Sequence, residues 1–192
     1  MDDNSLNKDV KNAIKVLEKG GVILYPTDTI WGIGCDATNR LAVEKIYRIK
    51  KREQNKSMIV LLDNMVHLSS YLENIPSIAY EMLLKADCPL TIIYPEAKNL
   101  AENVIAFDGS IAIRIPDNEF CQKLIRTFGK PIVSTSANFS GEPSAISFDN
   151  ISANILSQMD YIVQFNQNQI IKTKPSRIVK LNKDVGFVVI RE

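Results

Sequence analysis

Three polar segments contain the side chains best suited to bind a ligand rich in negative charge. Residues 25–34 follow an apolar run and contain hydroxyls, a carboxylate and two glycines, and residues 134–141 contain three serines, a threonine and an asparagine. Between them lie Lys50 and Arg52, with Lys56 close behind. Ligand-binding loops sit at strand ends on a rigid scaffold, arginine offers a fork of donors to phosphate oxygens, and lysine offers a point charge. Together the segments predict a polyanion site.

Each segment also has a structural interpretation, which the sequence leaves open. Cations near a helix C-terminus are favoured by the helix dipole, and Ser, Thr and Asn side chains cap turns. Arg114 lies in the apolar run 111–115, where a buried guanidinium must meet an anion, either a ligand or a structural Asp or Glu. The chain has neither a P-loop nor a dinucleotide-binding glycine motif, so a nucleotide site must be built from separated side chains.

Alternating helices and strands must position these segments. Hydrophobic periodicity and the placing of Gly and Pro predict the elements that follow. Helices are expected over residues 6–19, 39–51, 78–86, 119–128 and 150–159, and strands over 22–25, 58–62, 90–94, 111–115, 132–134, 161–165, 177–181 and 187–191. Because the last two strands form a hairpin, the pattern indicates an α/β fold with a twisted mixed sheet flanked by helices. No repeat or linker divides the chain, so residues 1–192 are expected to form a single domain.

The bulk composition excludes several classes of protein. The formal net charge of +1 argues against a protein whose whole surface binds nucleic acid. No apolar run approaches the ~20 residues needed to span a bilayer. The polar, acidic N-terminus is unlike a secretory signal. We therefore expect a cytoplasmic protein without membrane contact.

The cysteines and the single histidine do not form a pattern that binds metal. Cys35, Cys88 and Cys121 are odd in number and widely spaced, and His67 is the only histidine. No resident metal site is therefore expected, and the cysteines are interpreted as buried thiols in a reducing compartment. His67 is not expected to act as a base, because a general base normally has an orienting partner.

Four motifs in a fixed order carry a family resemblance. The runs YPTDTIWGIG, KKR with Lys56, IAIRIP and STSANFSGEPS resemble the YrdC family of L-threonylcarbamoyladenylate synthases in its short, single-domain form. The resemblance implies an α/β sheet curved around a concave, basic cavity. It implies a nucleotidyltransferase that converts L-threonine, bicarbonate and ATP, with Mg²⁺ accompanying the ATP, into L-threonylcarbamoyl-AMP and pyrophosphate. Downstream threonylcarbamoyl-transfer proteins would then modify tRNA.

The resemblance also implies roles for individual residues, and the chain departs from the family pattern at several positions. Leu61 stands where histidine is common, Ile146 stands where threonine is common, with Ser144 or Ser147 as a substitute, and Arg177 replaces a threonine. An apolar wall near Ile30 or Leu61 would favour threonine over serine. The resemblance assigns Lys50 and Arg52 to catalysis. The residues that it assigns to ATP binding are Arg52, Lys56, Ser110, Asn138 and Arg191. Those that it assigns to L-threonine binding are Thr29, Arg114, Ser136 and Ser176.

Two other functions use the same features. A double-stranded RNA-binding module could present the same concave basic surface, and weak RNA binding by that route is an expectation that salt would reduce steeply. A carbamoyl-transferring domain of hydrogenase maturation proteins has a related fold. That second function would require acylphosphatase-like and zinc-finger regions, for which this chain has neither the length nor the cysteines.

Overall fold

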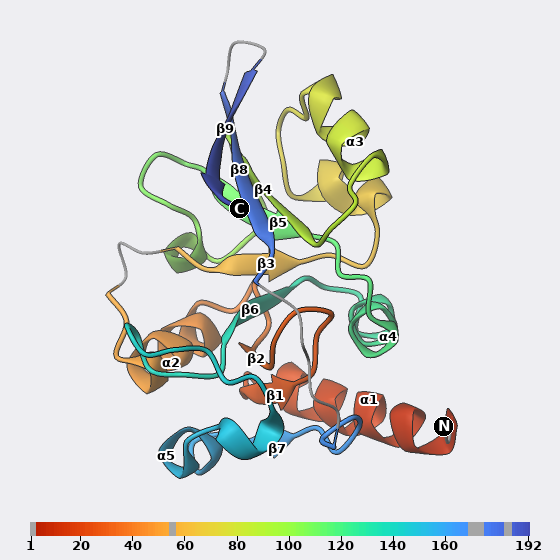
Figure 1. The fold of residues 1–192 in the computed structure, drawn as a ribbon, viewed down its shortest axis with the longest axis vertical. Helices are drawn as coiled ribbons and strands as arrows, with labels where there is room; N and C mark the ends of the chain where they lie inside the picture. The colour runs from red at the N-terminus through yellow and green to blue at the C-terminus, as the bar shows by residue number, and fades with distance from the viewer. Residues whose placement is uncertain (1–2, 54–56, 169–174, 183–185) are drawn as a thin grey trace.

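A mixed β-sheet forms the centre of the fold (Figure 1). The computed structural model describes residues 3–53, 57–168, 175–182 and 186–192. Within them the sheet has nine strands in the order β7-β1-β2-β6-β3-β5-β4-β8-β9. The strands are β1 (Ile23–Tyr25), β2 (Gly32–Gly34), β3 (Ile59–Leu61), β4 (Leu90–Tyr94), β5 (Ile111–Arg114), β6 (Ile132–Ser136), β7 (Tyr161–Ile162), β8 (Arg177–Asn182) and β9 (Gly186–Arg191). The α-helices are α1 (Asp3–Glu18), α2 (Arg40–Lys50), α3 (Ser77–Leu84), α4 (Glu119–Phe128) and α5 (Ala153–Leu156).

Both parallel and antiparallel strand pairs occur, as the sequence predicts. The pairs β3–β5, β4–β8 and β1–β7 are parallel, whereas β1–β2, β2–β6, β3–β6, β4–β5 and β8–β9 are antiparallel. Figure 1 shows α1 beside β1 and β7 at one end of the sheet, and α3 beside the β8–β9 hairpin at the other. No helix of the described residues is long and apolar enough to cross a membrane.

The two faces of the sheet carry different side chains because successive residues of a strand point to opposite sides. One face packs its apolar side chains, such as Val60, Val133 and Ile92, into the larger core cluster together with α2. On the other face, Tyr25 and Leu61 pack with α1 and α4 in a second cluster. Beyond the reach of those two helices, this second face bears small and polar side chains, which leave it hollow.

The segment after helix α2 brings Arg52 to that hollow. The helix is capped at its start by Asn39, whose side chain accepts hydrogen bonds from the Leu41 and Ala42 amides at 3.0 and 3.2 Å. It ends where Lys51 adopts a left-handed conformation with φ 50°. The two residues on either side of this break, Lys50 and Arg52, therefore leave the helix in different directions.

Most predicted elements are confirmed, and three predictions are wrong. The strand expected over residues 161–165 is shortened to β7, Tyr161–Ile162. Residues 32–34 were expected to lie in a loop but form β2, which is hydrogen-bonded between β1 and β6. Helix α5 spans only Ala153–Leu156 instead of residues 150–159. The predicted turn of the last hairpin includes residues 183 and 184, which lie outside the described residues.

Strand β2 owes its place to close packing around Gly34. A Cβ atom there would lie 2.5 Å from the Val133 carbonyl oxygen and 2.7 Å from Cε1 of Tyr25. Since the carbonyl is backbone, it cannot move aside cheaply. We expect Gly34→Ala to lower the free energy of unfolding by about 1–3 kcal/mol, the usual cost of overpacking. Denaturant unfolding would check this, and an unchanged midpoint would show that the sheet can relax around the methyl group.

Candidate functional site

A cavity of about 280 Å³ occupies the hollow face of the sheet. Arg52, Arg114 and Arg191 line it together with hydroxyl side chains, and no described lining residue is acidic. Three larger grooves, of about 890, 500 and 360 Å³, have at most one arginine each among their described lining residues. The cavity lining comprises Thr27, Thr29, Ile30, Gly32, Arg52, Ser57, Met58, Ile59, Ile93, Ala112, Arg114, Ser134, Thr135, Ser136, Ser144, Pro175, Ser176, Ile178, Ile190 and Arg191.

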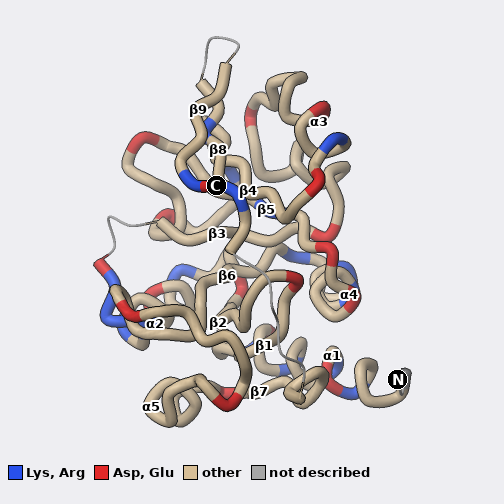
Figure 2. Tube along the Cα trace, in the orientation of Figure 1, with Lys and Arg blue, Asp and Glu red and all other residues tan. Residues whose placement is uncertain are grey.

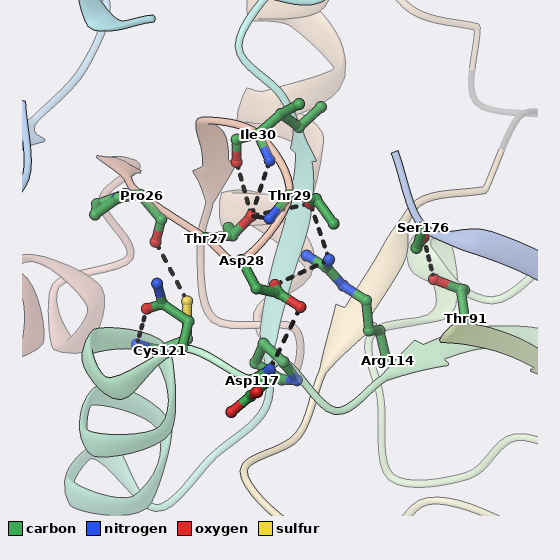
Figure 3. A network of polar contacts seen from close by, with 12 residues as sticks. Pro26, Thr27, Asp28, Thr29, Ile30, Thr91, Arg114, Asp117, Cys121 and Ser176 are labelled. Atoms are coloured by element: carbon green, nitrogen blue, oxygen red, sulfur yellow. Dashed lines mark hydrogen bonds and ion pairs between the residues drawn. The ribbon is translucent and has the colours of Figure 1, made fainter. Parts of the chain in front are cut away.

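Arg114 is the most deeply placed cation of the cavity. It ends β5, and its side chain is 4% exposed. Its Nη1 lies 2.9 Å from the Thr29 hydroxyl and 3.0 Å from Oδ1 of Asp28, toward which the guanidinium points in Figure 3. Its Nε has no hydrogen-bond partner among the described residues. The sequence left open whether a ligand or a structural carboxylate meets this arginine. The structure supplies the carboxylate and still leaves one donor for a ligand.

The β1–β2 loop fixes the Thr29 hydroxyl through Thr27, a residue that sequence reasoning did not single out. The Thr27 hydroxyl accepts hydrogen bonds from the amides of Thr29 and Ile30 at 3.0 and 3.2 Å and donates to the Ile30 carbonyl at 2.7 Å. The two threonine hydroxyl oxygens lie 3.0 Å apart. This is the turn-capping behaviour of threonine, which is the sequence signal that could have identified Thr27.

Ser176 and Arg191 close the opposite side of the cavity. Arg191 donates from Nε and Nη2 to the Ser176 carbonyl at 3.0 and 2.7 Å. The Ser176 hydroxyl lies 2.7 Å from that of Thr91, as Figure 3 shows. Burial, and secondarily the charge of Arg114, lower the pKa of Arg191. These contacts hold two predicted ligand-binding residues on neighbouring segments, one before β8 and one at the end of β9.

Arg52 lines the cavity from the segment that follows α2. Its Nη2 donates to the Ser57 carbonyl at 2.9 Å, and burial is the main cause that lowers its pKa. Figure 2 shows basic residues at the end of α2 and near the C-terminus, and also at α1, α3 and α4, with acidic residues interspersed among them. The cavity lining is therefore basic although the formal net charge of the chain is only +1.

Six of the ten residues predicted for the site therefore lie together in the cavity lining. They are Thr29, Arg52, Arg114, Ser136, Ser176 and Arg191. Lys56 lies outside the described residues. The remaining three, Lys50, Ser110 and Asn138, are described but do not belong to the lining.

These three residues instead make contacts within the protein. The Ser110 hydroxyl donates to Asp108 at 2.5 Å, and Ser110 is buried. The Asn138 amide group donates to the carbonyls of Phe139 and Glu142, while its buried Oδ1 has no hydrogen-bond partner among the described residues. Lys50 is buried and directs its ammonium at main-chain carbonyls.

The family departures have distinct structural consequences. Leu61 is fully buried in the core cluster beneath α1 and α4, so the expectation that it walls the site is wrong. Ser144 lines the cavity, whereas Ile146 is exposed, which agrees with a substitution of one for the other. Arg177 forms an exposed ion pair with Glu192 at 3.0 Å.

The cysteines and His67 lie away from the cavity. Cys35 and Cys121 are buried free thiols and Cys88 is half-buried. Burial raises the pKa of the Cys121 thiol, and that of Cys35 is raised by burial and by Asp36. His67 does have an orienting partner, contrary to expectation, because its Nδ1 lies 2.8 Å from Oδ1 of Asp63.

Comparison with known proteins places these features in a family. Residues 15–192 match the Sua5, YciO and YrdC family model, which is described as "Telomere recombination". The threonylcarbamoyl-AMP synthase of Pseudoalteromonas translucida is 36% identical over 79% of this chain and 82% of its own length. That of Vibrio vulnificus is 30% identical over 80% of this chain and 84% of its own length.

Solved structures share the fold. E. coli YciO, 26% identical, superposes with a TM-score of 0.84 over 96% of this chain and 89% of its own. Sua5 of P. abyssi, complexed with L-threonine, is 24% identical with a TM-score of 0.86. The match covers 95% of this chain but 53% of that protein, so this chain spans about half its length. From the matched family model and the curated relatives, the chain belongs to the Sua5/YciO/YrdC family.

Proposed function

We infer that this protein is an L-threonylcarbamoyladenylate synthase, a nucleotidyltransferase that joins L-threonine, bicarbonate and ATP. The observation that carries the inference is Arg114, a buried arginine in a cavity lined by hydroxyls, with Nε unpartnered among the described residues. Relatives at 30–37% identity over most of the chain are threonylcarbamoyl-AMP synthases. Such a site suits an amino acid carboxylate beside a nucleotide.

The proposed L-threonine site is the deep part of the cavity. Arg114 would bind the carboxylate, because a guanidinium offers a fork of donors that matches two carboxylate oxygens. The hydroxyls of Thr29, Ser136 and Ser176 line the same cavity and offer further hydrogen bonds. The P. abyssi relative of this fold has been solved with L-threonine bound, which supports an amino acid site in the fold.

The proposed ATP site is the more open part of the cavity. Arg52 and Arg191 would neutralise the polyphosphate. Asn138, which lies outside the cavity lining, would contact the nucleotide through Oδ1, which has no hydrogen-bond partner among the described residues. Lys56 and Ser110 stay predictions for the same site. Mg²⁺ would enter with the ATP as part of the substrate, because metal ions neutralise the charge of a leaving polyphosphate.

The reaction requires no nucleophile from the protein. The threonine amine would combine with bicarbonate to form a carbamate, releasing water. A carbamate oxygen would then attack the α-phosphorus of ATP, and pyrophosphate would leave with the bonding electron pair. The side chains of this chain would act by holding the two substrates in line and by stabilising negative charge. Arg52 is proposed as the catalytic cation for this chemistry. Lys50, the other residue predicted to be catalytic, is buried outside the cavity lining, so no contact with substrate is assigned to it.

Pyrophosphate release with each substrate omitted in turn tests the function. We expect release from ATP only when both L-threonine and bicarbonate are present. Threonine-independent release would overturn the assignment, and RNA binding that needs no threonine would favour the RNA-binding alternative.

We also expect a partial preference for L-threonine over L-serine. Ile30, Ile59 and Ala112 contribute apolar atoms to the cavity lining, which can contact the extra methyl group. One methyl or methylene group is worth about 1–3 kcal/mol in such a pocket. The ratio of kcat/KM for the two amino acids would measure this preference. Equal kcat/KM values for L-threonine and L-serine would exclude an apolar subsite for the methyl group.

We propose that transfer of the threonylcarbamoyl group to tRNA needs other proteins. This protein would act before that transfer, in the cytoplasm. The motivation is the low net charge, since a net charge of +1 gives weak long-range attraction to a polyanion. Adenylate synthesis is therefore expected without tRNA, and any RNA binding is expected to be weak.

A further inference from the structure

The end of α2 and the turn after β6 are joined through a buried lysine. The Lys50 ammonium lies 2.5 Å from the Ser136 carbonyl oxygen and 2.6 Å from that of Asn138. The residue is 1% exposed and does not belong to the cavity lining. Its charge therefore faces the protein backbone, behind the turn that carries Ser136 and Asn138.

Further contacts join the same two segments. The amide of Ser140 donates to the Lys50 carbonyl at 3.0 Å, and the Lys51 ammonium lies 5.3 Å from the centre of the Phe139 ring. Within the turn, the backbone N–H of Asn138 donates to the Ser136 carbonyl at 2.9 Å. The Ser136 carbonyl thus accepts from both the turn and the lysine, so the conformation of residues 136–138 depends on the ammonium.

A buried ammonium is costly unless strong acceptors surround it. Two carbonyl oxygens at short distance meet that need, and the charged groups that face Lys50 are Arg52, which opposes its charge, and Glu142, which favours it. Burial, followed by the charge of Arg52, lowers the pKa of Lys50 to about 8. Lys50 is therefore charged at neutral pH and loses that charge in mildly alkaline solution.

We propose that Lys50 is a positioning residue for the proposed adenylate synthesis: by bridging the carbonyls of Ser136 and Asn138 it holds the turn that orients Asn138 toward ATP. It does not touch the phosphates. This deepens the proposed function, on which it rests, and it reassigns Lys50 from contact with substrate to support of the neighbouring turn.

A double-mutant cycle distinguishes support from direct contact. Lys50→Met keeps the unbranched stem and removes the three donors, and Asn138→Ala removes the group that Lys50 is proposed to orient. Calorimetry of ATP binding should show each single variant weakened by about 10- to 100-fold, the range for a hydrogen bond to a charged group. The double variant should be no weaker than the weaker single variant. Multiplied effects would overturn the proposal, because independent contacts add in free energy.

The matched control is Lys11→Met, which removes the same charge from an exposed position on α1. It should bind ATP like the unmodified protein. Amide hydrogen exchange of residues 136–140 without any ligand gives a second readout, and we expect faster exchange in Lys50→Met than in Lys11→Met. Unchanged exchange would overturn the proposal even if the protein bound no ATP. Absence of ATP binding by the unmodified protein would instead overturn the proposed function.

The pH dependence of the unmodified protein needs no variant. ATP affinity should be nearly constant below about pH 7 and fall as pH rises through about 8, where Lys50 loses its proton and its donors weaken. Lys50→Met should lack this alkaline fall. A fall of equal size in Lys50→Met would assign it to another group and contradict the proposal.

Discussion

The Arg114→Ala variant is expected to lose measurable L-threonine binding and to be the least stable of the variants considered. Arg114 and Asp28 form an ion pair in which both side chains are almost fully buried, at 4% and 9% exposure. Removing one partner leaves an uncompensated buried charge, which costs about 3–5 kcal/mol of unfolding free energy. Thermal unfolding and calorimetry with threonine would measure the two effects separately.

Two further variants separate the loss of binding from the loss of stability. Arg114→Lys keeps the charge that Asp28 needs but loses the fork of donors, so it should stay folded and still bind threonine poorly. Asp28→Asn removes the carboxylate that shares the guanidinium, so it should bind threonine at least as tightly as the unmodified protein while unfolding more easily. Normal threonine binding by Arg114→Lys would mean that this arginine is only half of a structural pair.

Local signals in the sequence predicted the elements whose ends are set by their own residues. Helix α4 has the predicted bounds because Asn118 caps its first turn and Gly129, with φ 74°, ends it. Strand β2 was missed because Gly32 and Gly34 have low strand propensity. It exists because β1 and β6 supply hydrogen bonds on both sides, and that information is not local.

The site was predictable in its residue types but not in the directions of its side chains. Strand alternation places Ser134 and Ser136 on the same face of the sheet, and the apolar run around Arg114 indicates a buried cation. Neither pattern tells that Asp28 pairs with that arginine or that Lys50 turns away from the cavity. Both facts depend on contacts between segments far apart in the chain. The residue type alone does not specify in which direction a lysine or aspartate side chain points.

Arg52→Ala is expected to weaken ATP binding strongly while leaving L-threonine binding unchanged. Arg52 lines the cavity from the segment after α2, whereas Thr29 and Arg114 contact each other from the β1–β2 loop and β5. Loss of a charged hydrogen bond to phosphate in such a site costs about 2–5 kcal/mol, which corresponds to at least about 30-fold in affinity. Calorimetry with each ligand, and the KM for ATP in pyrophosphate release, would measure the effect.

The control for Arg52→Ala lies four residues earlier, in the last turn of α2. Arg48 is 77% exposed and pairs with Glu44, so Arg48→Ala removes an identical charge without reaching the cavity. It should leave the KM for ATP unchanged, because an exposed charge at this distance is screened by salt. Equal loss in both variants would mean that the basic end of α2 attracts ATP by its summed charge. A loss confined to Arg52→Ala, with threonine binding intact, would show that this one guanidinium contacts the nucleotide. Together with the opposite pattern in Arg114→Lys, it would assign the two substrates to two ends of one cavity.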